Sequence, residues 1–342
     1  MPSRRLPALL LAPILAAALA PAPAAASPYP IDMGNLTDFL FVFTDGSNDA
    51  NWQGSSNGYV GDVAINGLLA KERSSGSFDY SGTIHSNDGS LGGWQRIVDN
   101  NPGTAAASLG QTDLIDGLTA DFERAFAQGS ALQTTIGFGN RSSSSLHNLN
   151  VFDDPNQVFV IDITSGLSIS SAINITGRAD QVFVMRWDTD ANPTNGYQGT
   201  VKFQSGGGIN PLGGLTAANF IHLAGNLDAS GGGSAPSGLQ ELYGTESGGF
   251  FTGYWLTTGD AKGETSSFSN ANFAGGWYTS TSKFSMTSGT RGIHVAPLLA
   301  PPPLHPPHDA PPLAPIPLPA GVWLLLGGLG TLLALRRRRA PA

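Results

Sequence analysis

The residues best suited to chemistry in this 342-residue chain are oxygen-bearing side chains that alternate along one short segment. Asp188, Asp190 and Asn192 follow a D-x-D-x-N pattern. Alternation places their oxygens on one side of a loop, and Ca²⁺ binds such hard oxygen ligands. An EF-hand would need Gly at position 193 and Glu at position 199, where this chain has Pro193 and Gly199. Ordinary Asx turns are the main expectation for this pattern, and a structural calcium ion at Asp188, Asp190 and Asn192 is the alternative.

No set of side chains meets the demands of a catalytic centre. Residues 54–58 match the G-x-S-x-G nucleophile elbow, but that motif needs a helix directly after it, and no helical pattern follows. The histidines are scattered, and His222, inside an apolar run, is expected to be a core or edge residue with satisfied hydrogen bonds. The absence of cysteine excludes thiol catalysis and thiolate metal sites. We therefore expect no enzymatic activity, and a polysaccharide-active enzyme with two facing carboxylates is the third-ranked reading.

Tryptophans offer a second possible binding chemistry. Trp94, Trp255 and Trp277 adjoin Gly or Tyr and would suit an exposed ledge on which sugar rings stack. Buried packing is the more common use of such large side chains. Ice binding would prefer regular rows of Thr-x-Thr, and residues 279–281 are one of the few examples. Core packing is the main expectation, and a glycan- or ice-binding surface is the alternative.

The charge balance excludes nucleic acid as a partner. Residues 31–296 contain 11 basic and 24 acidic residues, which gives a net charge of −13. A surface of this sign repels DNA, RNA and anionic lipid.

Most of residues 31–296 consists of short β-favouring runs closed by Gly, Asn, Asp or Ser. Two runs, at 157 and 181, begin with the same Gln-Val-Phe-Val sequence. The positions taken as equivalent, 24, 19 and 19 residues apart, are Val158, Val182, Val201 and Phe220. About 20 residues per coil is typical of a parallel β-solenoid. We predict an all-β fold, a right-handed parallel β-solenoid, with a β-sandwich or jelly roll as the alternative.

One segment, residues 113–132, has the period of a helix. Its apolar residues recur at spacings of three and four, with Asp113 and Asp116 in the first turn. Gly129 is expected to end it. Gly117, in its interior, costs about 1 kcal/mol relative to alanine. The pattern predicts one amphipathic helix that covers a flank of the sheet.

Both ends of the chain read as targeting segments. Residues 1–26 combine Arg4 and Arg5, an apolar stretch and a small-residue site, which predicts a signal peptide cleaved between Ala26 and Ser27. Residues 297–319 hold 11 of the 24 prolines, which predicts an extended stalk. An apolar run at 320–335 then predicts a transmembrane helix. Four arginines that resist translocation follow it: Arg336, Arg337, Arg338 and Arg339.

The tail resembles the VPLPA variant of the PEP-CTERM sorting signals. The residues that carry the likeness, besides the four arginines, are Pro317, Leu318, Pro319, Ala320 and Gly321. Ile316 stands where that family usually has Val. The resemblance implies a Gram-negative bacterium and an exosortase-like processing enzyme as a partner. It also implies a transient inner-membrane anchor before processing.

The remainder is similar to the choice-of-anchor A group of bacterial surface proteins, with an ice-binding-like β-solenoid. The likeness covers most of 34–295, and its phrases are 52–54, 58–65, 71–73, 92–95, 186–190, 213–215, 219–222, 229–233, 249–255 and 275–278. The group implies a location at the cell surface and no settled activity.

Together these features predict four segments. Residues 1–26 are the signal peptide, 27–296 the β-rich ectodomain, 297–316 the proline-rich linker and 317–342 the sorting signal. The main functional expectation is a secreted, non-catalytic protein of the cell surface or extracellular matrix. It would act in adhesion or in building a biofilm matrix, with extracellular polysaccharide or another cell surface as its partner. An ice- or glycan-binding module on the same anchor is the alternative.

Overall fold

The computed structural model describes residues 29–45, 49–52, 58–67, 79–188, 199–204, 206–230, 249–259, 266–269, 271–280, 283–286 and 290–298. All of them belong to the first of two compact units, Met1–Ala300. The strands in this part of the chain pair in parallel and form one sheet of 15 strands and one of six. The predicted parallel β-solenoid is confirmed, and the sandwich alternative is wrong because its strands would pair antiparallel.

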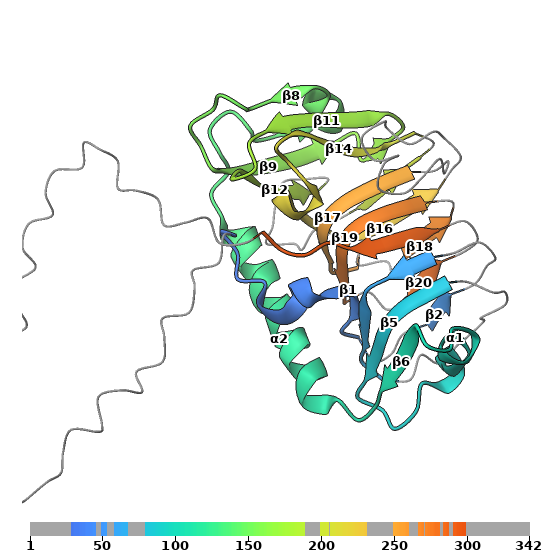
Figure 1. The fold of residues 1–342 in the computed structure, drawn as a ribbon. Helices are drawn as coiled ribbons and strands as arrows, with labels where there is room; N and C mark the ends of the chain where they lie inside the picture. Colours follow the sequence, from blue (N-terminus) through green and yellow to red (C-terminus); the bar gives the residue numbers. More distant parts are fainter. Residues whose placement is uncertain are drawn as a thin grey trace, which may run out of the picture. The chain divides into compact units, whose positions relative to one another are not determined.

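The coils have three faces (Figure 1). The first, here called the helix face, consists of β9 (Val158–Ser165), β12 (Val182–Trp187), β15 (Phe220–Ala224), β1 (Phe39–Phe43), β4 (Asp62–Ile65) and the second halves of β17 (Gly249–Thr257), β19 (Ala271–Thr279) and β5 (Asp79–Ser86). Short strands β7 (Arg141–Ser142) and β6 (Ala105–Ser108) pair with β9 and β5 at its two ends.

The second, the six-stranded face, is a sheet of its own: β10 (Ser168–Ile169), β13 (Thr200–Phe203), β16 (Asn226–Ser230), β18 (Ser266–Ser269), β20 (Lys283–Met286) and β2 (Asp49–Trp52). The third, the groove face, contains β8 (Leu149–Asn150), β11 (Ala172–Gly177), β14 (Gly208–Gly213), β21 (Arg291–His294), β3 (Gly58–Val60) and the first halves of β17, β19 and β5.

The N-terminal coil stacks on the next coil in sequence on one side and on the last coil of the described chain on the other. β1 pairs with β19, β2 with β20 and β3 with β21. All three faces are therefore continuous across a junction between residues more than 200 positions apart. Coil order in space differs from coil order in sequence, so no regular repeat along the chain could reveal it.

The predicted repeat was partly wrong. Val158 does pair with Val182, as the shared Gln-Val-Phe-Val start predicted. Val201, however, lies in β13 on the six-stranded face, and Phe220 pairs with Phe183. Each 19-residue spacing joins strands of two different faces, because each face carries a similar short apolar strand.

Helix α2 (Thr112–Ala131) is the predicted helix, displaced by one residue at each end. Ile115, Leu118, Phe122 and Ala125 form its buried side and cluster with outward side chains of the helix face. The strands of this face are consequently buried on both sides, and β1 and β12 are fully buried sequences. The remaining helices are short: α1 (Gln95–Asn100) and the 3₁₀ turns η1 (Gly34–Asp38), η2 (Gly92–Trp94), η3 (Ser143–Leu146) and η5 (Ala217–Asn219).

Gly129 does not end α2, contrary to expectation. The helix continues to Ala131, and a Cβ at position 129 would lie 2.7 Å from Leu223 and 2.9 Å from Ile31. Its glycine thus permits close packing of the helix on the sheet. Gly117 has no such role, since a Cβ there would meet nothing within 4 Å.

The interior is a stack of large side chains in register. One row runs Ile161, Met185, His222, Trp255, Trp277, Phe41, Val63 and Ile84. A second row stacks Phe159, Phe183 and Phe220, with ring centroids 5.1 and 5.0 Å apart. This stacking of like residues on successive coils is how a solenoid builds a continuous core.

Candidate functional site

The predicted calcium site is not assembled by the described residues. Asp188 is buried at 3% exposure, and its backbone N–H donates to the Ile163 carbonyl. Asp190 and Asn192 lie outside the residues that the structure describes. Within the described ranges no three His, Asp or Glu side chains are placed to hold a metal ion. Calcium at this position stays a prediction.

His222 is the core residue that the sequence predicted. It is fully buried, stacked on Trp255 with centroids 3.9 Å apart. Its Nδ1 accepts a hydrogen bond from the Trp187 indole N–H at 3.1 Å, and its Nε2 donates to the Thr252 carbonyl at 3.0 Å. These partners assign the neutral tautomer with the proton on Nε2. Burial lowers the pKa of His222 to about 3, although the hydrogen bond to Thr252 acts in the opposite direction.

Core packing, the main expectation for the tryptophans, is confirmed for those that the structure describes, and the exposed aromatic ledge is wrong. Trp94, Trp187, Trp255 and Trp277 are among the largest fully buried side chains. The indole of Trp277 donates to the Thr257 hydroxyl at 2.9 Å, and that of Trp255 to the Thr252 carbonyl at 3.0 Å. Stacked sugar rings have no access to these faces.

The nucleophile-elbow match is also a structural feature. Gly58, its last residue, begins β3, which pairs with β21 on one side and β5 on the other. The elbow requires a helix at that position. The other four residues of the match lie outside the described part of the chain.

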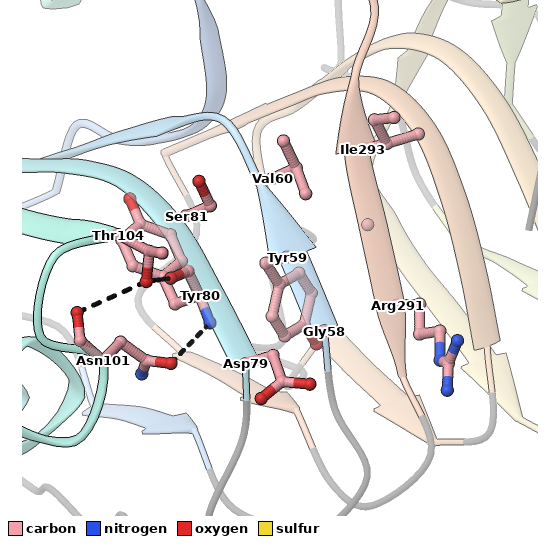
Figure 2. Close-up of a pocket in the computed structure, with 11 residues that line it drawn as sticks. Gly58, Tyr59, Val60, Asp79, Tyr80, Ser81, Asn101, Thr104, Arg291 and Ile293 are labelled. Carbon is pink, nitrogen blue, oxygen red and sulfur yellow. Dashed lines mark hydrogen bonds between the residues drawn. The ribbon is translucent and has the colours of Figure 1, made fainter.

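A groove of about 430 Å³ lies on the groove face, across β21, β3 and β5 (Figure 2). Its lining residues are Gly58, Tyr59, Val60, Asp79, Tyr80, Ser81, Asn101, Thr104, Arg291, Gly292 and Ile293. No sequence motif predicts this set of residues, which comes from four separate segments. The one hint was the phrase at 58–65, part of the resemblance to surface proteins.

The groove has an apolar floor and charged groups at its edge. Val60 is 51% exposed, and Ile293, its register partner, is half-buried. Figure 2 shows Asp79 and Arg291 on either side of Gly58, at the end of the groove away from Val60 and Ile293. Asp79 is the sole carboxylate among the lining residues. A glycosidase needs two, so this groove does not support hydrolysis of a polysaccharide.

One wall of the groove is fixed by hydrogen bonds. The backbone N–H of Tyr80 donates to the Asn101 side-chain oxygen at 3.0 Å, and the Thr104 hydroxyl donates to the Tyr80 carbonyl at 2.8 Å. The Tyr80 hydroxyl donates to the Gly61 carbonyl at 3.0 Å. Burial, with the nearby Asp62 charge, raises the pKa of Tyr80 well above its usual range, so this donor persists at any ordinary pH.

The two predicted targeting segments fall outside the described residues. This applies to the cleavage site at Ala26 and Ser27, to the linker at 299–316, to the sorting signal at 317–321 and to the arginines at 336–339. None of the helices in the described ranges combines the length and apolar character that crossing a membrane requires.

Comparison with known proteins identifies the fold. No protein-family model and no curated protein sequence matches the chain. Among solved structures, the DUF3494 domain of ice-binding protein 1 from Shewanella frigidimarina is 14% identical with a TM-score of 0.51, covering 79% of this chain and 99% of that one. The ice-binding protein LeIBP of an Arctic yeast is 13% identical with a TM-score of 0.47, covering 81% and 98%. At these identities, the first likeness establishes that the chain has the ice-binding type of parallel β-solenoid fold, and nothing finer.

Proposed function

We propose that the protein is a secreted, non-catalytic ice-binding module whose six-stranded face meets the ice surface. The observation that carries the proposal is a fold shared with the Shewanella ice-binding domain, together with the exposed residues that the structure describes on this face. Its described outer residues Ser168, Lys202 and Gln204 are exposed. The helix face is covered by α2, and the groove face is partly covered by η5, whose Ala217 packs on Ala274.

Regular spacing supports a crystalline ligand. Successive register partners on the six-stranded face are Ser168, Lys202, Asp228, Ser267, Ser285 and Asn51. Adjacent parallel strands are about 4.8 Å apart, so polar residues recur at a constant interval across six coils. A row with this period suits a repeating surface better than a single soluble molecule.

Lys202 and Asp228 distinguish this row from the threonine arrays that the sequence analysis required for ice. Charged groups hold their hydration water strongly, which opposes its ordering into a lattice. We therefore expect modest ice activity. The same two neighbouring residues favour the second candidate, adhesion to another cell surface, which was the main expectation from the sequence.

The test is the freezing behaviour of the secreted protein and of two tyrosine variants. Wild type is expected to shape ice crystals and to inhibit recrystallisation. Lys202→Tyr, on β13, the second strand of the six-stranded face, should reduce both effects several-fold, because the bulky ring prevents the face from lying flat on the ice. Asp116→Tyr on the exposed side of α2 is the matched control and should leave them unchanged. Absence of ice shaping by the wild type would refute ice binding and leave adhesion as the function to pursue.

Export and sorting form a separate part of the proposal. Signal-peptide cleavage after Ala26 is supported by Tyr29, which is already buried and whose hydroxyl donates to the Ala218 carbonyl at 2.9 Å. We expect the intact mass of the mature protein to lack residues 1–26 and the tail beyond about Pro317, with tail removal dependent on an exosortase-like enzyme. A mature protein that retains Arg336–Arg339 in the inner membrane would contradict sorting, and would leave a plain membrane anchor.

A further inference from the structure

The groove on β21, β3 and β5 has no part in the proposed contact with ice, because it lies on a different face of the solenoid. We propose that it is a carbohydrate site that binds one or two hexopyranose units of a neutral polysaccharide. This site would operate independently of the six-stranded face.

The floor of the groove suits the apolar face of a sugar ring. Ala274, Ile293 and Val60 are successive register partners on β19, β21 and β3. Ala217 of η5 covers Ala274, but this cover ends before Val60. Beside this strip, Gly58 keeps the surface low because it has no side chain, whereas the missing Cβ of Gly292 faces Tyr59 in the core. A pyranose ring has one face of C–H groups, and burying them against Val60 and Ile293 removes apolar surface from water.

The edge of the groove suits the hydroxyls of the same ring. Arg291, Gly58 and Asp79 are register partners on three adjacent strands, so the two charged residues stand about 10 Å apart across Gly58. The Asp79 carboxylate accepts hydrogen bonds from two neighbouring hydroxyls, and the Arg291 guanidinium donates two in parallel. The exposed Ser81 adds a third polar group. An accepting carboxylate and a donating guanidinium beside an apolar floor together match a sugar ring, which has hydroxyls at its edge and an apolar face.

The size of the groove, the charge of the protein and the rigidity of one wall restrict the class of ligand. The volume of about 430 Å³ falls in the range of small-molecule sites, roughly 300–1,000 Å³. The net charge of −13 over residues 31–296 repels acidic polymers, which favours a neutral chain. The hydrogen bonds that fix Asn101 and Thr104 against Tyr80 hold one wall in place before binding. Such preorganisation reduces the entropy lost when the sugar binds.

The experiment is calorimetric titration of the full secreted protein with cellohexaose, laminarihexaose, maltohexaose and mannohexaose. At least one should bind. Gly58→Val fills the floor without strain, because the nearest atom to its Cβ is Arg291 Cγ at 4.0 Å. We expect it to weaken binding at least tenfold. Asp79→Asn, which removes the charge from two hydrogen bonds, should weaken binding about tenfold. Gly89→Val is the matched control, since a Cβ there meets nothing within 4 Å and lies outside the groove.

Three results would overturn the carbohydrate site. They are no binding of any of the four probes, binding that Gly58→Val and Asp79→Asn leave intact, and tighter binding of hexagalacturonate that Arg291→Gln abolishes. The last result would assign the groove to an acidic polymer instead. The groove variants should still shape ice, and Lys202→Tyr should still bind sugar. Because each variant should lose one activity alone, failure of the ice proposal and failure of the sugar proposal can be distinguished.

Discussion

Replacing Arg186 with methionine is expected to lower the free energy of unfolding by about 3–5 kcal/mol. Arg186 lies on the outer side of β12, and its Nε donates to the Asp162 carboxylate of β9 at 2.7 Å. Its Nη1 donates to two carbonyls at the end of α2, those of Ser130 at 3.0 Å and Leu132 at 2.8 Å. Both charged side chains are largely buried, with 9% and 18% of their surfaces exposed.

The physical reason is that one side chain satisfies two requirements at once. The last carbonyls of a helix have no partners within the helix, and a cation at that end also interacts favourably with the helix dipole. Methionine leaves these carbonyls without their donor and Asp162 without its countercharge. Removing one member of a buried pair costs far more than replacing both.

Chemical denaturation followed by circular dichroism measures this effect. Arg186→Lys should fall between wild type and Arg186→Met, because lysine keeps the charge but lacks the planar fork that reaches β9 and α2 together. Adding Asp162→Asn to Arg186→Met should recover part of the loss. Lys202→Met, at an exposed position of β13, should change stability by about 0.5 kcal/mol or less. A loss in Arg186→Met no larger than in this control would show that α2 is held by apolar packing alone.

Local signals in the sequence predicted the elements well but not their connections. The three- and four-residue spacing of Leu118, Phe122 and Ala125 predicted α2, because the buried side of an amphipathic helix is formed by apolar residues that recur with the helical period. Nothing near Arg186 indicates that its partners are carbonyls 54 and 56 residues away. Contacts of this kind depend on how the coils stack and which faces become neighbours, and no local sequence pattern indicates that.

The coil order and the groove escaped prediction for the same reason. Phe159 and Phe183 are 24 residues apart, whereas Phe183 and its partner Phe220 are 37 apart, so coil length varies and no fixed period exists. The junction of β1 with β19 brings together strands from opposite ends of the described chain. The groove lies beside this junction, since β3 and β21 meet there. Its residues come together only when the N-terminal coil stacks on the last coil of the described chain.

The second large effect concerns acid. Stability is expected to fall by about 1.4 kcal/mol for each pH unit below 6.5 through His222 alone, or roughly 3 kcal/mol by pH 4. Burial lowers the pKa of this imidazole in the folded protein to about 3, below its ordinary value of 6.5. Between these two pH values the unfolded chain binds a proton that the folded chain does not. The contribution is therefore complete above pH 6.5 and is lost as pH falls toward 3.

The hydrogen bonds of His222 explain why protonation is incompatible with the fold. Its Nδ1 accepts from the Trp187 indole, which has no lone pair to offer in return. A proton on Nδ1 would place two donors face to face and would leave a charge among Trp187, Trp255 and Phe220. Glutamine in the same place offers one acceptor and one donor at every pH. At pH 7.5 His222→Gln should be less stable than wild type, because glutamine packs less well on Trp255. Near pH 4 its free energy of unfolding should approach or exceed that of wild type.

Urea denaturation at half-unit steps from pH 7.5 to 4 distinguishes this contribution from the acidic residues, because those are common to both proteins. The difference between wild type and His222→Gln should change by roughly 3 kcal/mol across that range. His147→Gln, a substitution outside the interior row, is the control and should give a curve parallel to wild type. Parallel curves for His222→Gln as well would mean that the solenoid core accommodates the charged ring, through water or a local opening near Trp187.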